Sequence, residues 1–306
     1  MRWQSSPTKK TIMKLYAISD LHVGYKINRQ ALASLPPHLE DWLILAGDIG
    51  ETQEHLHYAL DLLSKRFARL FWVPGNHDLW TTRNQQNGHN AGNDEERLRG
   101  EAKYQALIAI CRQYGVTTPE DPYTLWTGEG GPALLVPLFM LYDYSFRPAN
   151  IAEEDAVAWA EETNVVCSDE YQLHPDPYPS RTAWCHGRYR YSEQRLQEVP
   201  ENTPLILINH FPLRERLVRL KRIPRFSLWC GTKLTDNWHT RFPVSVVVYG
   251  HLHIRATDYQ DHVRFEEVSL GYPPQWRQPR GVEAYLRQIL PEPRRPLVQA
   301  GPIWHW

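Results

Sequence analysis

Residues 71–80 read FWVPGNHDLW, and the rest of the chain is best interpreted outward from this stretch. An apolar run typical of a buried strand stops at a Pro-Gly pair, and Asn76, His77 and Asp78 follow at once. Burying an amide, an imidazole and a carboxylate on one tight turn costs free energy unless each side chain finds a partner. The turn alone could be an Asx turn with a capping aspartate, so its meaning depends on similar sites elsewhere.

Other strand-like runs end in the same way. Runs at 14–19, 42–46, 205–208 and 244–249 are followed by the clusters Asp20-Leu21-His22, Gly47-Asp48, Asn209-His210 and Gly250-His251-Leu252-His253. In α/β sheets, ligand sites lie beyond the carboxyl ends of the strands. We therefore expect these clusters and the turn at 76–78 to meet at one sheet edge.

The segments between these runs predict an α/β fold. Stretches near 28–35 and 52–66 have helical spacing of apolar residues, and strand-helix-strand order implies right-handed βαβ units. Residues 81–95 are polar and predict a loop, and a helix is predicted at about 95–114. Further strands are predicted at 134–139 and 263–269.

Two segments depart from this pattern. Residues 149–200 mix acidic residues, aromatics and prolines, and we interpret them as an insertion over one edge of the core that resembles a lid. Residues 1–12 precede the first strand-like run and are expected to form a disordered extension. Residues 13–306 are then predicted to form a single domain.

Composition limits the classes of function. The chain has 306 residues, 42% hydrophobic and 23% charged, with a formal net charge of −1. A near-neutral protein has no general field that attracts a nucleic-acid duplex or an anionic membrane. No apolar run approaches the roughly 20 residues of a membrane span, and no signal-peptide pattern opens the sequence. Four scattered cysteines without a C-x-x-C pair are typical of reduced thiols, so a cytoplasmic location is expected.

The polar clusters together predict a metal centre. They offer two aspartates, one asparagine and four histidines as ligands, and one further histidine. Imidazole and carboxylate favour zinc, iron or manganese over calcium. Because a single ion would leave too many ligands unused, two divalent or trivalent transition-metal ions are predicted.

The order D-x-H, G-D, G-N-H-D, H and G-H-x-H resembles the calcineurin-like metallophosphoesterase family over about residues 13–80 and 204–270. The resemblance implies a four-layer α/β/β/α sandwich with two metal ions at one sheet edge. It also implies a ligand set: Asp20, His22 and His253 for the first metal, Asn76, His210 and His251 for the second, and Asp48 bridging both.

The chemistry of such a centre is hydrolysis of a phosphomonoester or phosphodiester. Two metals about 3.5–4 Å apart can share a bridging hydroxide and stabilise the entering and leaving oxygens. The resemblance makes His77 the substrate-facing histidine, and its imidazole is the natural general acid for the leaving group. Asp78, which is adjacent, and Glu51, three residues after the bridging aspartate, are both candidates to orient it.

The substrate is less constrained. Arg214, in the basic stretch after His210, and Arg83, just past the GNHD turn, are candidates for binding substrate phosphate, although a solvated charged face is the alternative. The aromatic insertion favours a closed pocket for a small-molecule phosphate ester. Two alternatives are a catalytically inactive scaffold of the same fold and a nuclease. The presence of every ligand position and of His77 favours an enzyme over a scaffold.

Overall fold

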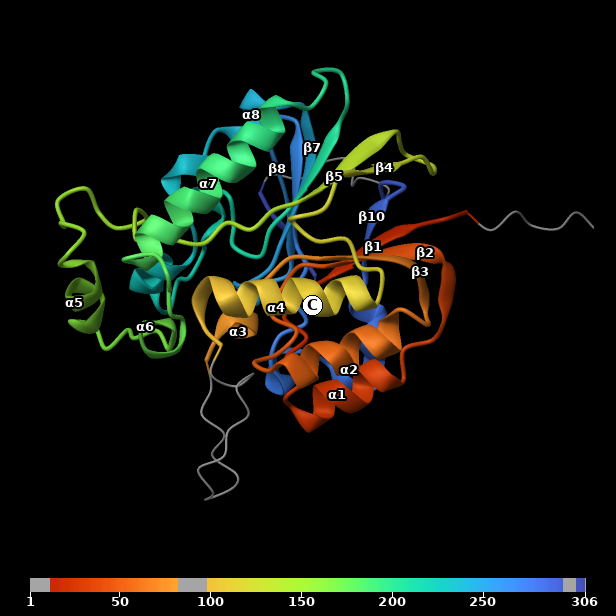
Figure 1. Ribbon diagram of the computed structural model, residues 1–306, viewed down its shortest axis with the longest axis horizontal. Helices are drawn as coiled ribbons and strands as arrows, with labels where there is room; N and C mark the ends of the chain where they lie inside the picture. Colours follow the sequence, from red (N-terminus) through yellow and green to blue (C-terminus); the bar gives the residue numbers. More distant parts are fainter. Residues whose placement is uncertain (1–11, 82–97, 294–300, 306) are drawn as a thin grey trace, which may run out of the picture.

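The computed structural model describes residues 12–81, 98–293 and 301–305, and Figure 1 shows two β-sheets between layers of helices. The first sheet has the strand order β10-β1-β2-β3, from β1 (Leu15–Ile18), β2 (His38–Leu45), β3 (Phe67–Trp72) and β10 (Arg287–Leu290). The second has the order β11-β8-β9-β7-β6-β5-β4, from β4 (Thr124–Trp126), β5 (Ala133–Pro137), β6 (Leu205–Ile208), β7 (Val244–Tyr249), β8 (Ala256–Gln260), β9 (Val263–Glu267) and β11 (Ile303–Trp304).

The helices cover the outer faces of both sheets. The α-helices are α1 (Lys26–Ala33), α2 (Gln53–Leu63), α3 (Asn76–Leu79), α4 (Gly100–Gln113), α5 (Ala156–Glu161), α6 (Asp169–Gln172), α7 (Arg181–Gln197) and α8 (Trp238–Arg241). Short 3₁₀ turns are η2 (Glu215–Leu217), η3 (Pro224–Trp229), η4 (Lys233–Thr235), η5 (Pro273–Gln275), η6 (Gln278–Arg280) and η7 (Val282–Tyr285). Helices α1, α2 and α4 lie on the side of the first sheet, and α7 lies beside the second (Figure 1).

Alternation along the strands explains the four layers. On β2, Leu43 and Leu45 belong to the large hydrophobic core that includes Leu56 and Leu60 of α2. Ile44, between them, belongs to a second hydrophobic cluster, which joins the inner faces of the two sheets through β1, β3, β6 and β7. Because successive side chains on a strand point to opposite faces, one apolar run serves both layers. The predicted α/β/β/α sandwich is confirmed.

Parallel pairing places the functional turns at one edge. Strands β1, β2 and β3 pair in parallel, and so do β5, β6, β7 and β9. The carboxyl ends of β1, β2, β3, β6 and β7 therefore point toward one side, as the sequence predicted. A bridge between Ser19 and Ser269 joins the two sheets next to this edge.

The segment at 149–200 contains two different kinds of structure. Its last part is α7, which connects the parallel strands β5 and β6, as a crossover helix of the second sheet does. Its earlier part, with the short helices α5 and α6, reaches the functional edge. The N-terminal extension predicted at 1–12 lies outside the described residues apart from Ile12, and the loop predicted at 81–95 lies outside them apart from Thr81.

Within the described residues, no helix has the length and apolar character that crossing a membrane requires. The four cysteines, Cys111, Cys167, Cys185 and Cys230, are buried free thiols.

Candidate metal centre

The strand-end turns adopt a backbone conformation that most residues avoid. Asp20, His22, Asp48, His251 and His253 all have positive φ, between 42° and 70°. Non-glycine residues rarely occupy this left-handed region, and such strain concentrates at functional sites. Backbone strain is therefore found at five of the seven positions that were predicted to bind metal.

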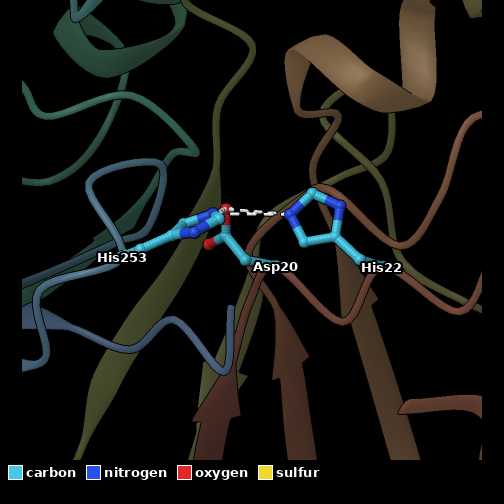
Figure 2. A group of neighbouring side chains, drawn as sticks. All are labelled: Asp20, His22 and His253. Carbon is cyan, nitrogen blue, oxygen red and sulfur yellow. Dashed lines mark hydrogen bonds and ion pairs between the residues drawn. The ribbon is translucent and has the colours of Figure 1, made fainter. Parts of the chain in front are cut away.

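The first ligand group consists of Asp20, His22 and His253, whose side chains converge from two distant parts of the chain (Figure 2). Nε2 of His253 lies 2.9 Å from Oδ1 of Asp20, and Nε2 of His22 lies 4.0 Å from the same oxygen. The two Nε2 atoms are 3.3 Å apart. Two imidazole nitrogens and a carboxylate oxygen aimed at one point are the donor set that a transition-metal ion prefers.

The second group is centred on His210. Its Nε2 lies 3.4 Å from Oδ2 of Asp48 and 3.2 Å from Oδ1 of Asn76. Its Nδ1 hydrogen-bonds the carbonyl oxygen of Ala46 at 2.9 Å. A metal-binding histidine usually fixes its ring by donating the other ring N–H in this way. Asp48 also joins Asp20 and His210 in one cluster of candidate ligands, which suits a residue between two ions.

His251 completes this side of the centre. Its ring lies 5.2 Å from that of His210, and its Nε2 is buried without a hydrogen-bond partner among the described residues. A buried, unpaired ring nitrogen costs free energy unless a ligand satisfies it. The residues of the centre therefore fit a bound metal.

The protonation states of four candidate ligands also favour cation binding. Burial lowers the pKa of His22 to about 3 and that of His251 to about 3, so both rings are neutral near pH 7, which is the form that coordinates metals. Burial works against the ionised carboxylates, but nearby histidines, His253 at Asp20 and His210 at Asp48, keep the pKa of both aspartates below the usual range. Burial acts to lower the pKa of the other two candidate ligands, but Asp48 raises that of His210 to about 10 and Asp20 raises that of His253. These two rings would therefore release a proton when a metal binds.

Glycines allow the turns to approach one another. A Cβ atom on Gly75 would collide with the carboxylate of Asp48, and one on Gly250 would collide with that of Asp20. These two glycines are therefore required by close packing against the ligands.

His77 lies next to both ligand groups and contacts Glu51. Its Nδ1 is 3.4 Å from Oε1 of Glu51, its Nε2 is 3.4 Å from the hydroxyl of Tyr272, and its ring centre is 3.6 Å from that of Trp80. Burial lowers the pKa of His77, but the carboxylates of Asp48 and Glu51 outweigh this and raise it above its usual value.

Asp78, the other candidate for orienting His77, binds backbone groups instead. Its carboxylate accepts backbone N–H bonds from Gly75, Asp48, Ile49 and Gly50. Burial, together with the charge of Asp48, raises the pKa of Asp78 to about 7. The side chain joins the turn after β3 to the turn after β2, and Glu51 is the candidate acid that contacts His77.

The predicted substrate role of Arg214 is not supported by its position. Its guanidinium contacts His239, Gln260 and Asp261 at 2.7, 2.9 and 3.3 Å. Gln260 and Asp261 lie at the turn where β9 begins, whereas the metal ligands lie beyond the opposite, carboxyl end of the parallel strands. The chain leaves His210 toward the far end of the sheet, which proximity in sequence could not reveal. Arg83 lies outside the described residues.

Three contact residues were missed at the sequence level: Trp80, Asp169 and Tyr272. Tyr272 stacks on His22, with ring centres 4.5 Å apart, and Asp169 hydrogen-bonds the amide of Asn76. No local motif marks Tyr272 or Asp169, since they are separated from His22 and Asn76 by 250 and 93 residues. Trp80 ends the stretch 71–80, and its ring packs against that of His77.

A pocket of about 300 Å³ opens beside the centre. Asp48, Asn76, His77, His251 and His253 contribute the polar part of its lining. An apolar part of the lining, called here the apolar wall, comes from residues 166–168 and from the segment 220–226: Val166, Leu220, Ile223 and Phe226. The pocket therefore has a reactive floor and an apolar wall.

The model of the calcineurin-like phosphoesterase family matches residues 13–255, a span that includes every predicted metal ligand. The chain belongs to the calcineurin-like phosphoesterase family. The resemblance drawn from the strand-end motifs is confirmed.

Individual proteins also match most of the chain. The acyl-carrier-protein phosphodiesterase PptH of Mycobacterium tuberculosis is 47% identical over 298 residues, which cover 96% of this chain and 89% of PptH. The crystal structure of phosphopantetheinyl hydrolase (PptH) from the same organism has a TM-score of 0.85 at 46% identity, covering 93% of this chain and 98% of the other. The crystal structure of TT1561 from Thermus thermophilus has a TM-score of 0.44 at 13% identity, over 85% of this chain and 90% of the other.

These matches make the chain a metal-dependent phosphoric ester hydrolase. The expectation of an enzyme is confirmed, and the residue groups around Asp20 and Asp48 are its candidate metal-binding residues.

Proposed function

We propose that this chain is a dinuclear metal-dependent phosphodiesterase that hydrolyses the diester linking a phosphopantetheinyl group to an acyl carrier protein. The observation that supports the proposal is the convergence of seven candidate ligand side chains beside an apolar-walled pocket, in a chain 47% identical to an acyl-carrier-protein phosphodiesterase. The sequence alone left monoester and diester substrates open, and the relative favours the diester.

The donor set supports two ions. Asp20, His22 and His253 would hold one, Asn76, His210 and His251 the other, and Asp48 would lie between them. A bound pair of manganese, iron or zinc ions supplies a Lewis acid that polarises phosphoryl oxygens and lowers the pKa of water. The rest of the chemistry falls to the side chains of the chain.

His77 is placed to protonate the leaving group. In the overall reaction, water oxygen bonds to phosphorus, the bond from phosphorus to the carrier-protein oxygen breaks, and that oxygen takes up a proton. Glu51 faces Nδ1 of His77, which leaves Nε2 as the proton donor on the side of Asp48 and the pocket. The carboxylates of Asp48 and Glu51 raise the pKa of His77 above its usual value, which favours the protonated ring that a general acid requires.

The apolar wall suits a slender arm with hydrocarbon segments. Ile223 and Val166 line the pocket although they are 44% and 63% exposed, respectively. Apolar side chains left in water gain free energy when a ligand covers them. A phosphopantetheinyl arm would enter alone, while its carrier protein stays outside. The pocket would therefore bind a phosphate group with a small organic arm in both cases, whether the substrate is the predicted small-molecule phosphate ester or a protein-linked diester.

The test is direct hydrolysis of a phosphopantetheinylated carrier protein. We expect the Mn²⁺-loaded enzyme to release the phosphopantetheinyl group, measured as the corresponding mass loss by intact-protein mass spectrometry, and the His77→Ala variant to fail. If the enzyme hydrolysed bis-p-nitrophenyl phosphate but left the phosphopantetheinylated carrier protein intact, the carrier protein would be rejected as the substrate. Hydrolysis of neither compound would support the inactive scaffold.

A further inference from the structure

The short helix α6 brings a carboxylate to the metal-ligand turn that no motif assigns to it. Asp169 is fully buried, and its Oδ1 accepts hydrogen bonds from Nδ2 of Asn76 at 2.9 Å and from Nε1 of Trp80 at 2.6 Å. Asn76 begins α3 and Trp80 directly follows its last residue. A single oxygen atom therefore holds both ends of the turn that carries His77.

The first contact decides which end of the Asn76 amide faces the ligand cluster. A carboxylate only accepts hydrogen bonds, so Asp169 can pair with the NH₂ end of the amide and not with its oxygen. Oδ1 of Asn76 is thereby directed to the other side, where it lies 3.2 Å from Nε2 of His210. Since a metal binds the oxygen of an asparagine, Asp169 selects the binding-competent orientation.

The second contact reaches His77 through Trp80. The Trp80 ring lies against His77, with ring centres 3.6 Å apart and planes inclined by 32°. Because the indole N–H is fixed by Asp169, the ring cannot turn without losing that bond. Glu51 restrains Nδ1 of His77 from another side. The imidazole of His77 is therefore restrained both by the carboxylate of Glu51 and by the ring of Trp80.

Stability does not explain why a carboxylate occupies this position. Oδ2 of Asp169 is buried and has no partner among the described residues, which costs free energy. The neighbouring Glu170 already attaches α6 to the second half of the molecule. It accepts hydrogen bonds from Tyr144 at 2.8 Å and Trp229 at 2.7 Å and pairs with Arg181.

We propose that Asp169 is a positioning residue that fixes the Asn76 amide as a metal ligand and, through the same oxygen, fixes Trp80 against His77. The inference rests on the dinuclear centre of the proposed function and extends it. It assigns part of the predicted 149–200 insertion to the metal centre, where the sequence suggested only a cover.

Mn²⁺ titration tests the first contact without relying on activity. Binding of Mn²⁺ alone is followed by isothermal calorimetry and by electron paramagnetic resonance, which distinguishes one ion from a coupled pair. We expect two ions in the unaltered chain and about 10- to 100-fold weaker binding of one of them in Asp169→Ala. The other ion should be unaffected, because the side chain of Asp169 hydrogen-bonds Asn76 and Trp80 and none of the ligands of the first group.

Two further variants separate positioning from folding. Asp169→Asn keeps the shape and one acceptor oxygen, so its loss of Mn²⁺ affinity should be smaller than that of Asp169→Ala. Glu170→Ala is the matched control, since it loosens the same helix without touching the turn, and both Mn²⁺ affinities should stay unchanged. Equal weakening in Glu170→Ala and Asp169→Ala would overturn the proposal, as would two unaltered affinities in Asp169→Ala and Asp169→Asn.

Trp80→Phe tests the second contact. The ring remains but its N–H is lost, so both Mn²⁺ affinities should persist while hydrolysis of the carrier protein falls more than that of bis-p-nitrophenyl phosphate. Equal rates for Trp80→Phe and the unaltered enzyme on both substrates would reject the link to His77. Absence of Mn²⁺ binding by the unaltered chain would instead reject the dinuclear centre itself.

Discussion

The turns that hold the candidate metal ligands and the apolar wall share one pocket but are built in different ways. The candidate ligands Asp20 and Asp48 are 0% and 2% exposed, and they lie on strained turns between buried strands. On the wall, Ile223 and Val166 are 44% and 63% exposed and lie outside the sheets.

This difference suggests a division of roles: the buried turns carry out the reaction, and the exposed apolar wall selects the substrate. Changes in the candidate metal ligands of the turns should alter the rate for every phosphate ester, because all substrates need the same metal-bound water; changes in His77 should depend on the leaving group. Changes in the apolar wall should alter the KM only for substrates that carry an arm long enough to cover it. Four variants test whether the molecule is divided in this way.

Asp48→Ala should have the largest effect. It removes the carboxylate next to His210 and His77, so both proposed ions would lose a ligand, and kcat should fall by at least on the order of 10³-fold on any substrate. The measurement is hydrolysis of bis-p-nitrophenyl phosphate at saturating Mn²⁺. Asp61→Asn, an exposed carboxylate that pairs with Lys65, is the control. Comparable activity of the two variants would contradict the bridging role.

His77→Ala should come next and should depend on the leaving group. Loss of a general acid costs about 10²–10⁴-fold when the leaving group is an alcohol. A nitrophenol leaves without a proton, so bis-p-nitrophenyl phosphate should be much less affected. The ratio of the two rates, measured on one preparation, is the test. An equal loss on both substrates would show that His77 has another role.

Glu51→Gln should shift the pH dependence of the reaction. The carboxylate raises the pKa of His77, and activity that needs protonated His77 is lost as pH rises through that pKa. Without the charge the pKa falls, so the alkaline limb of the pH–rate profile should move to lower pH, with a loss of about tenfold near neutrality. An unmoved limb for the carrier-protein substrate would reject Glu51 as the partner of His77.

Ile223→Ser should have the smallest effect and should appear in KM alone. Losing about half of the burial of one isoleucine costs roughly 1 kcal/mol, or about fivefold in KM for the carrier protein. Bis-p-nitrophenyl phosphate should keep its rate. Leu39→Ser, on β2 and 64% exposed, is the matched control and should change neither. If Ile223→Ser slowed the hydrolysis of both substrates, the apolar wall would not act on substrate choice alone.

The sequence was most informative where local pattern and topology agree. Strand-end clusters such as Asp20-Leu21-His22 predicted the ligand set, because parallel strands bring their carboxyl ends to one edge. The resemblance of these motifs to the calcineurin-like phosphoesterase family implied the sandwich. Strand β10 was missed, because Arg287 and Gln288 interrupt its apolar pattern, although it closes the first sheet beside β1.

The supporting contacts could not be predicted. The hydrogen bond from Asn76 to Asp169 spans 93 residues, and its register depends on how α6 packs against the turn. Arg214 shows the opposite case. It lies only four residues after His210 in the sequence, but its side chain points to the far end of the second sheet. Sequence separation predicts neither proximity nor direction once the chain leaves a strand.

The proposed chemistry depends on Asp48 lying between two metal ions at the shared edge of the two sheets. Anomalous scattering from crystals grown with Mn²⁺ would locate these ions. We predict two peaks about 3.5–4 Å apart, with Asp48 between them, Asp20, His22 and His253 around one and Asn76, His210 and His251 around the other. A single peak, or peaks away from Asp48, would refute the dinuclear centre.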